Sequence, residues 1–298
     1  MKMTRSEILE QLAKAQHGGY ALGSFSPRNT VLIGAVVRAA QATKSPVMVQ
    51  ISSNEMRWFE LEPQAFAEQL RKDTADAEVP VILHLDHTYD FETVKRAIGA
   101  GFHSVMIDGS KLPFEENVAL TCQVVQYAHE RNVAVEGELG NIGGADKLET
   151  GGDELLYTVP EQAAEFVRRT GCDTLAVSVG TAHGVYPTKN PSIDFERLAN
   201  IRDLIDTPLV LHGGSGLPME TVRRAICLKD GKGGIVKLNI ATDLELIFQK
   251  VMGVTRMPNR DTLQLDSDLL RQAADQVQAF VQGRMRDFLY SAGKANGA

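Results

Sequence analysis

Short hydrophobic stretches rich in β-branched residues alternate along the chain with longer stretches in which apolar residues recur every three to four positions. The short stretches have the length of buried strands, and the longer ones have the period of amphipathic helices. Eight strands are predicted at Ala21–Phe25, Val47–Ile51, Val81–Leu85, Ser104–Ile107, Val133–Glu138, Thr174–Val177, Leu209–Leu211 and Ile235–Asn239. The helices predicted between them include Phe91–Ala100, Asn117–Arg131, Glu161–Thr170, Phe195–Ile205 and Met219–Cys227.

Eight strand–helix units without a proline-rich linker favour one α/β domain over residues 1–298, a closed parallel (β/α)8 TIM barrel. An open, doubly wound sheet is the competing fold. No GxGxxG motif follows the first strand, which disfavours a dinucleotide-binding version of that fold. Apolar residues at helical spacing predict a C-terminal helical extension at about 264–291, which packs on the barrel exterior or forms a subunit contact.

Composition and charge narrow the class of protein. The 298 residues are 43% hydrophobic, which is enough for a large core, and the net charge of -7 leaves no basic surplus for a nucleic-acid partner. The three cysteines form no CxxC pair, which favours a reducing compartment. No signal peptide and no long apolar segment is evident, so we expect a soluble cytoplasmic protein with no membrane partner.

Polar motifs follow one predicted strand after another. In (β/α)8 enzymes the chemistry lies at the C-terminal ends of the strands, so these motifs are expected to meet at one mouth. They are His84–His87, Asp108–Ser110, Glu136–Glu138, Gly180–Gly184, His212–Gly216 and Lys237–Asn239.

Three histidines, His87, His183 and His212, come from three different strand ends. A single histidine is more often a structural residue, but three imidazoles with an open fourth position describe a catalytic zinc site. The convergence therefore predicts a bound divalent cation. Imidazole ligands favour zinc without excluding cobalt, iron or manganese.

Two glycine-bearing loops follow predicted strands. In His212-Gly-Gly-Ser-Gly216 the glycines let backbone N–H groups approach an anion, and a helix is predicted to begin near Pro218. This loop is therefore a candidate phosphate site. The loop Leu139–Leu155, with its five glycines, is predicted to be a mobile lid, or otherwise a flexible surface loop.

Taken in order, the motifs at His84–His87, Glu136–Gly144, Gly180–Gly184 and His212–Gly216 resemble those of the class II ketose-bisphosphate aldolases, the fructose- and tagatose-bisphosphate aldolase family. The resemblance covers essentially the whole barrel. It implies a carbon–carbon lyase that reversibly cleaves a ketose bisphosphate or ketose 1-phosphate. The products would be dihydroxyacetone phosphate and an aldehyde, formed through a zinc-stabilised enediolate.

The resemblance also implies roles for single residues. His87, His183 and His212 would bind one zinc ion per subunit, with Glu138 beside the metal or as an alternative ligand. Asp86 would be the acid/base at the substrate oxygen. Asp146 matches the lid-loop proton donor, one methylene shorter than the usual glutamate. Substrate and phosphate contacts are expected at Asn29, Ser52, Gly184, Gly213, Gly214, Ser215, Asn239, Ala241 and Thr242.

Two departures from the family pattern concern the substrate. Pro187 occupies a position at which many relatives carry a lysine, and Lys189 is a candidate substitute. The arginine for a second phosphate is not evident, and Arg260 is only a candidate. The resemblance further implies a homodimer or homotetramer, a phosphorylated sugar as the small-molecule partner, and a monovalent cation as a second candidate cofactor.

Three alternatives stay open at the level of sequence. Lys237 shares strand parity with Asn239, so it could form a Schiff base inside the barrel without a metal. A metal-dependent sugar-phosphate epimerase or isomerase would use the same site without breaking a carbon–carbon bond. The third alternative is a non-catalytic barrel that binds sugar phosphate as the partner subunit of another protein. Such a protein would not need the three histidines and Asp86, so their presence disfavours this alternative.

Overall fold

A computed structural model describes residues 3–142, 157–184, 192–228 and 233–295. Eight parallel strands form a closed barrel in the order β1 to β8, which confirms the predicted fold class. The strands are β1 (Leu22–Phe25), β2 (Val47–Ser52), β3 (Val81–Asp86), β4 (Ser104–Ile107), β5 (Ala134–Leu139), β6 (Thr174–Val177), β7 (Leu209–Leu211) and β8 (Ile235–Ile240).

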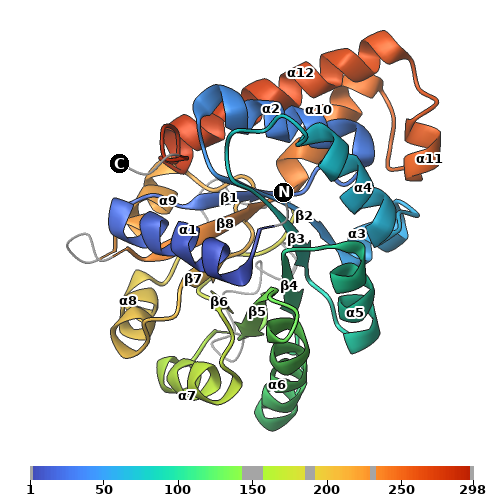
Figure 1. Ribbon diagram of the computed structural model, residues 1–298. Coiled ribbons are helices and arrows are strands. Elements are labelled where there is room, and N and C mark those ends of the chain that lie inside the picture. Colours follow the sequence, from blue (N-terminus) through green and yellow to red (C-terminus); the bar gives the residue numbers. More distant parts are fainter. Residues whose placement is uncertain (1–2, 143–156, 185–191, 229–232, 296–298) are drawn as a thin grey trace.

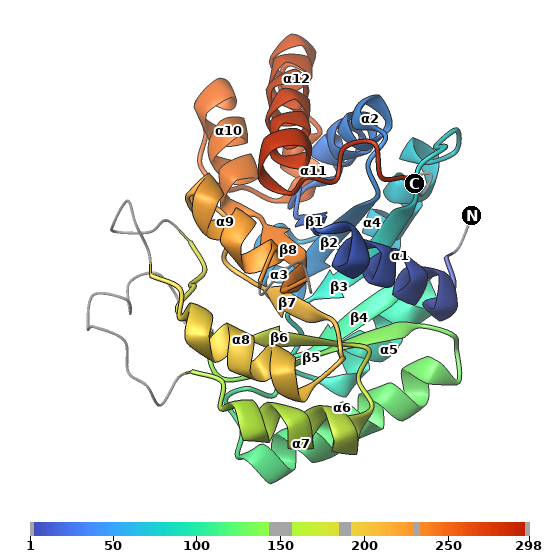
Figure 2. The same cartoon turned by 90° about the vertical axis from the view of Figure 1, so that its left-hand side faces the viewer.

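Helices surround the barrel (Figure 1 and Figure 2). They are α1 (Arg5–Gly18), α2 (Ile33–Thr43), α3 (Ser53–Trp58), α4 (Pro63–Asp73), α5 (Phe91–Ala100), α6 (Phe114–His129), α7 (Pro160–Thr170), α8 (Phe195–Leu204), α9 (Met219–Ile226), α10 (Thr242–Met252), α11 (Asn259–Thr262) and α12 (Ser267–Gly283). A 3₁₀ turn at Thr30–Leu32 precedes α2, and a π-helical turn at Arg284–Phe288 follows α12. Within the described ranges, no helix combines the length and apolar character that crossing a bilayer requires.

The helix ends follow from local chemistry. Thr4 and Glu7 form a capping box at the start of α1, and Gly101 ends α5 in the left-handed conformation. Helix α6 begins at Phe114, three residues before the predicted start. The preceding Pro113 fixes the entry of the chain, and two acidic residues favour the first turn, although the apolar period begins only later.

The two ends of the barrel are built differently. At the N-terminal end, Ile8 and Leu12 of α1 pack on Leu22 and Ile82 and close the barrel with apolar side chains. Figure 1 shows α1 lying across this end. The largest core cluster lies between the strands and the surrounding helices, and α12 packs beside α2 and α10 on the outside. The C-terminal ends of the strands are left for polar residues.

Candidate active site

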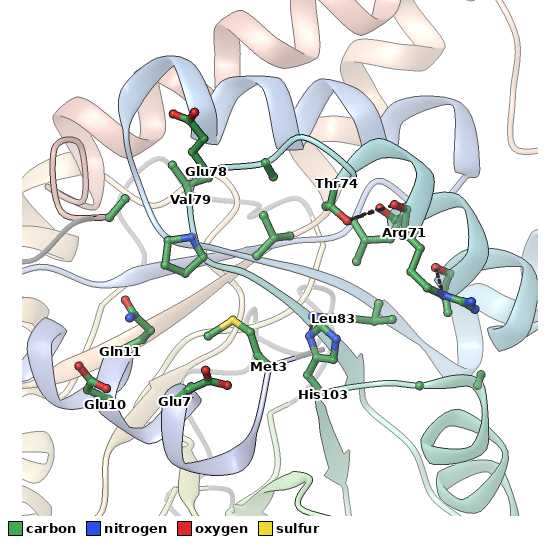
Figure 3. A pocket seen from close by; sticks show the side chains of 18 of the residues that line it. Met3, Glu7, Glu10, Gln11, Arg71, Thr74, Glu78, Val79, Leu83 and His103 are labelled. Atoms are coloured by element: carbon green, nitrogen blue, oxygen red, sulfur yellow. Dashed lines mark hydrogen bonds between the residues drawn. The ribbon is translucent and has the colours of Figure 1, made fainter. Parts of the chain in front are cut away.

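A cavity of about 430 Å³ lies at the C-terminal ends of the strands. Its wall includes Asp86, His87, His183, Ser215 and Asn239. A second cavity, of about 750 Å³, lies at the N-terminal ends of β3 and β4 and is shown in Figure 3. It contains none of the residues predicted to bind metal or phosphate, so the site is assigned to the C-terminal cavity.

The structure brings the three predicted histidines together. His87 directly follows β3, His212 directly follows β7, and His183 lies six residues beyond the end of β6. The Nε2 atom of His87 is 3.0 Å from Nε2 of His183 and 2.7 Å from Nδ1 of His212. One nitrogen from each ring lies within 4.8 Å of the others. Three imidazoles therefore face one point from three separate strands.

Two buried carboxylates orient two of these rings. Asp108 Oδ2 is 3.0 Å from Nδ1 of His87, and Glu136 Oε1 is 2.8 Å from Nε2 of His212. The opposite ring nitrogens are left to face the centre of the cluster. Imidazoles that bind a metal are held in this way, because a carboxylate on one nitrogen fixes the tautomer and frees the lone pair of the other.

The pKa values of the three histidines also fit a bound cation. Burial lowers the pKa of His183 and His212 well below the usual value, and the neighbouring His87 adds to the effect, so both rings are neutral. Burial lowers the pKa of His87 as well, but the charges of Asp86 and Asp108 outweigh it and raise that pKa to about 10. A divalent cation would replace this proton. The donor set and its charge therefore suit a divalent metal ion.

Glu138 lies where the sequence places it, beside the histidine cluster. Its Oε2 atom is 3.7 Å from Nδ1 of His87, is buried, and has no hydrogen-bond partner among the residues that the structure describes. Burial, followed by the nearby charge of Asp108, raises the pKa of Glu138 well above its usual value. His87, Asp108 and Glu138 form a second group whose ligand atoms are close enough to hold an ion.

Asp86 ends β3 and is buried in the wall of the cavity. Gln50 Nε2 donates to one carboxylate oxygen and Asn239 Nδ2 to the other, each at 2.9 Å. Burial raises the pKa of Asp86. Two side-chain amides thus fix the orientation of a desolvated carboxylate, as a general acid/base requires.

Lys237 points into the barrel, as its strand parity predicts, but it does not line the cavity. Its Nζ atom is 2.7 Å from Glu136 Oε2 and 3.2 Å from Nε2 of His84. Nδ1 of His84 is in turn 3.0 Å from Ser104 Oγ. Lys237 therefore supports the carboxylate that holds His212, an arrangement that gives the Schiff-base alternative no support.

The predicted phosphate contacts mostly lie together. Gly184, Gly213, Ser215, Asn239, Ala241 and Thr242 all line the cavity. Gly213 has a φ of 70°, and α10 begins at Thr242, so glycine backbone and the N-terminus of a helix meet at one place. Gly214 does not line the cavity, because its N–H donates to the carbonyl of Asn239 at 2.8 Å.

Above β1 and β2, only one of the two predicted substrate contacts lines the cavity. Ser52 lines the cavity and also caps α3, but Asn29 lines a small neighbouring cavity instead. The preceding Arg28 has a φ of 62°, and it is the Arg28 side chain that reaches the wall. Arg260 is exposed, pairs with Glu60 and does not line the cavity.

Sequence reasoning missed several residues of the site. Asp108 and Glu136 stand in the strand-end motifs, but only the register of the barrel shows which histidine each one meets. Gln50, Arg28 and Arg256 carry no sequence signal for this role. Asp146, Pro187 and Lys189, together with most of the predicted lid, lie outside the described residues.

Comparison with known proteins agrees with this geometry. The family described as "Fructose-bisphosphate aldolase class-II" matches residues 6–294. A fructose-bisphosphate aldolase of Geobacillus stearothermophilus is 40% identical over 297 residues, covering 98% of this chain and 99% of the relative. The structure is also similar to that of the YdjI aldolase from Escherichia coli K12, with a TM-score of 0.81, 33% identity and coverage of 97% and 98% of the two chains.

A fructose-bisphosphate aldolase from Campylobacter jejuni has the same fold at a TM-score of 0.76, with 24% identity and coverage of 96% and 95%. The family match spans nearly the whole chain and includes every strand that contributes to the histidine cluster. This chain therefore belongs to the class II fructose-bisphosphate aldolase family and is a carbon–carbon lyase.

Proposed function

We propose that this class II aldolase reversibly cleaves a phosphorylated ketose into dihydroxyacetone phosphate and an aldehyde, with one zinc ion per subunit. The observation that carries the proposal is the convergence of His87, His183 and His212 on one point next to Asp86. The family is generally zinc-dependent, and the tautomers set by Asp108 and Glu136 suit this ion.

The ligands of the cation would be Nε2 of His87, a ring nitrogen of His183 and Nδ1 of His212, with Glu138 as a neighbour or alternative ligand. When bound, the cation supplies positive charge that stabilises the negative charge left on the substrate when the carbon–carbon bond breaks. Asp108 and Glu136 keep the two rings in place.

Asp86 would accept the proton of the C4 hydroxyl as the bond breaks and return it in the direction of synthesis. The hydrogen bonds from Gln50 and Asn239 hold the Asp86 side chain in one conformation, in which its carboxylate faces the cavity. Asp146 remains the proposed proton donor to the product carbon. This second proton transfer rests on sequence resemblance alone.

The phosphate of the dihydroxyacetone portion would bind over β6, β7 and β8, at Gly184, Gly213, Ser215 and Thr242. Asn239 and Ala241 line the same wall, and Ser52 lines the wall above β2. Backbone N–H groups at the start of α10 favour an anion at this place.

We extend the proposal to the surroundings of the enzyme. The partner is a small phosphorylated sugar, the chain assembles as a homodimer or homotetramer in the cytoplasm, and a monovalent cation acts at most as an activator. Mass photometry tests the assembly. Replacement of potassium by tetramethylammonium in the assay tests the activator.

The central test is a ketose-phosphate panel run before and after dialysis against a strong chelator. We expect about one zinc ion per chain by elemental analysis, triose phosphate as a product, loss of activity after chelation, and recovery with zinc. Undiminished turnover by protein free of metal would disprove the metal-dependent reaction. Formation of an epimer without any triose phosphate would instead identify an epimerase or isomerase.

A further inference from the structure

Four charged side chains line the part of the cavity that lies above β1, β2 and α10, next to Ser52. Arg28 follows β1, Glu55 lies in α3, Glu245 lies in α10, and Arg256 follows α10, and all four line the cavity. We call this set the outer wall. The proposed reaction uses none of these four residues.

Ion pairs link the four side chains of the outer wall in the order Glu55, Arg28, Glu245 and Arg256. Arg28 donates through Nε to Glu55 at 2.8 Å and also pairs with Glu245. Arg256 donates to the two oxygens of Glu245 at 2.8 and 2.9 Å. The network contains two cations and two anions, so its formal charges cancel.

Several features hold the outer wall in place before any substrate arrives. Arg28, Glu55 and Glu245 are buried, and the second oxygen of Glu55 accepts from Ser26 Oγ at 2.7 Å. The guanidinium of Arg256 lies 4.3 Å from the ring centre of Trp58. Arg28 keeps a positive φ of 62°, which a non-glycine residue retains only where its surroundings fix it.

The position of the outer wall fits the far end of the substrate. The phosphate residues stand over β6 to β8, and Asp86, held by Gln50 and Asn239, lines the same cavity at the end of β3. A ketose that extends from the phosphate past Asp86 therefore directs its last carbons at the outer wall. Lys111 also lines the cavity, but it is an exposed residue after β4, where water screens its charge.

The chemistry of this wall distinguishes two substrate classes. A sugar hydroxyl both donates and accepts, so it can pair with a carboxylate and a guanidinium at once. A phosphate group only accepts and carries a charge of about −1.5 to −2 at neutral pH. Beside Glu55 and Glu245 it would meet two carboxylates whose charge already neutralises the arginines.

We infer that the outer wall selects ketose 1-phosphates with an uncharged, hydroxylated far end over ketose bisphosphates. This inference rests on the proposed function, because it names the substrate class of the same reaction. Glu245 is its main determinant, because this carboxylate pairs with both arginines. The carboxylates of the outer wall, rather than the size of the cavity, disfavour substrates with a second phosphate.

The test compares kcat/KM of the zinc-loaded enzyme for fructose 1-phosphate and tagatose 1-phosphate with the values for the corresponding 1,6-bisphosphates. We expect the natural enzyme to favour the 1-phosphates. Glu245→Gln leaves two arginines with one carboxylate, and should raise the bisphosphate-to-monophosphate ratio on the order of tenfold. Arg256→Gln leaves an excess of negative charge and should lower the same ratio.

Glu220→Gln is the matched control, because Glu220 is exposed outside the cavity and undergoes the same chemical change. Its ratio should equal that of the natural enzyme. Opposite shifts in the two outer-wall variants cannot arise from a general loss of folded protein. A preference of the natural enzyme for the bisphosphates, or shifts in the same direction, would overturn this inference alone. Absence of triose phosphate from all four sugars would refute the proposed function too.

Discussion

Asp86 shows how single side chains determine what this site can do. A carboxylate buried at the end of a strand loses hydration, and its pKa rises because burial penalises the charged form. The amide groups of Gln50 and Asn239 compensate by donating one hydrogen bond to each oxygen. The result is a carboxylate with a fixed direction that still faces the cavity.

We predict that Asp86→Ala lowers kcat by about 10²- to 10⁴-fold, the usual contribution of a general acid/base. Zinc content should remain at the natural level, because the three imidazoles are untouched. Steady-state kinetics and elemental analysis of the same preparation check both statements. A variant with near-normal kcat, or one that has lost its metal, would contradict the role assigned to Asp86.

The residues of the site divide according to what sequence can show. His87, His183 and His212 were predictable because each follows a predicted strand, and strand ends of a parallel barrel meet at one mouth. The residues that orient them were not. Whether Glu136 or Glu138 meets His212 depends on barrel register and side-chain direction, and these are set by packing across several strands.

At the scale of elements, the β-branched runs predicted all eight strands with bounds one residue or less from those observed. Parallel strands covered by helices are buried on both faces, so their signal is strong. The path after β1 was not predictable, because Arg28 has a positive φ and its partners Glu55 and Glu245 lie far from it in the sequence. As a result, Arg28 lines the cavity, whereas the predicted Asn29 lines a small neighbouring cavity.

The loop after β7 depends on glycine at one point. A Cβ atom on Gly213 would lie 2.3 Å from the carbonyl oxygen of Ala182, and its φ of 70° disfavours any other residue. We predict that Gly213→Ala raises KM for the phosphorylated ketose at least several-fold, because the loop must move away from the chain that carries His183. Kinetics and zinc content of the variant test this.

A second glycine provides the control for that experiment. Gly99 lies within α5, and a Cβ atom there would meet nothing within 4 Å. Gly99→Ala should leave KM unchanged and raise the free energy of unfolding by about 0.5–1 kcal/mol, since alanine favours a helix over glycine. Equal KM values for both variants would show that the loop after β7 does not bind the substrate phosphate.

At the scale of the whole molecule, stability and chemistry occupy opposite ends of one barrel. The N-terminal end is closed by the apolar contacts of α1, whereas the C-terminal end carries buried charges and an open cavity. Buried polar atoms that have no partner within the described ranges, such as Glu138 Oε2, lower stability, and the packed end offsets this loss. Changes at the two ends should therefore separate stability from activity.

Asp173 is the polar anchor of the N-terminal end. One of its oxygens accepts from Arg5 Nε at 2.8 Å, which attaches α1 to the barrel. The other oxygen is 2.9 Å from Nε2 of His129, at the end of α6, and accepts from the N–H of Val135 at 2.8 Å. This one buried carboxylate therefore joins α1, α6 and the start of β5.

We predict that Asp173→Asn lowers the free energy of unfolding by about 1.5–3 kcal/mol, because an amide N–H₂ would face donors that now bond to a carboxylate. Chemical denaturation measures this loss. The kcat/KM of the folded variant should stay at the natural value, since Asp173 lies at the end of the barrel opposite His87, His183 and His212. Asp275→Asn, an exposed change of the same charge on α12, should alter neither quantity. A stable Asp173→Asn variant with impaired turnover would show that the two ends of the barrel are coupled.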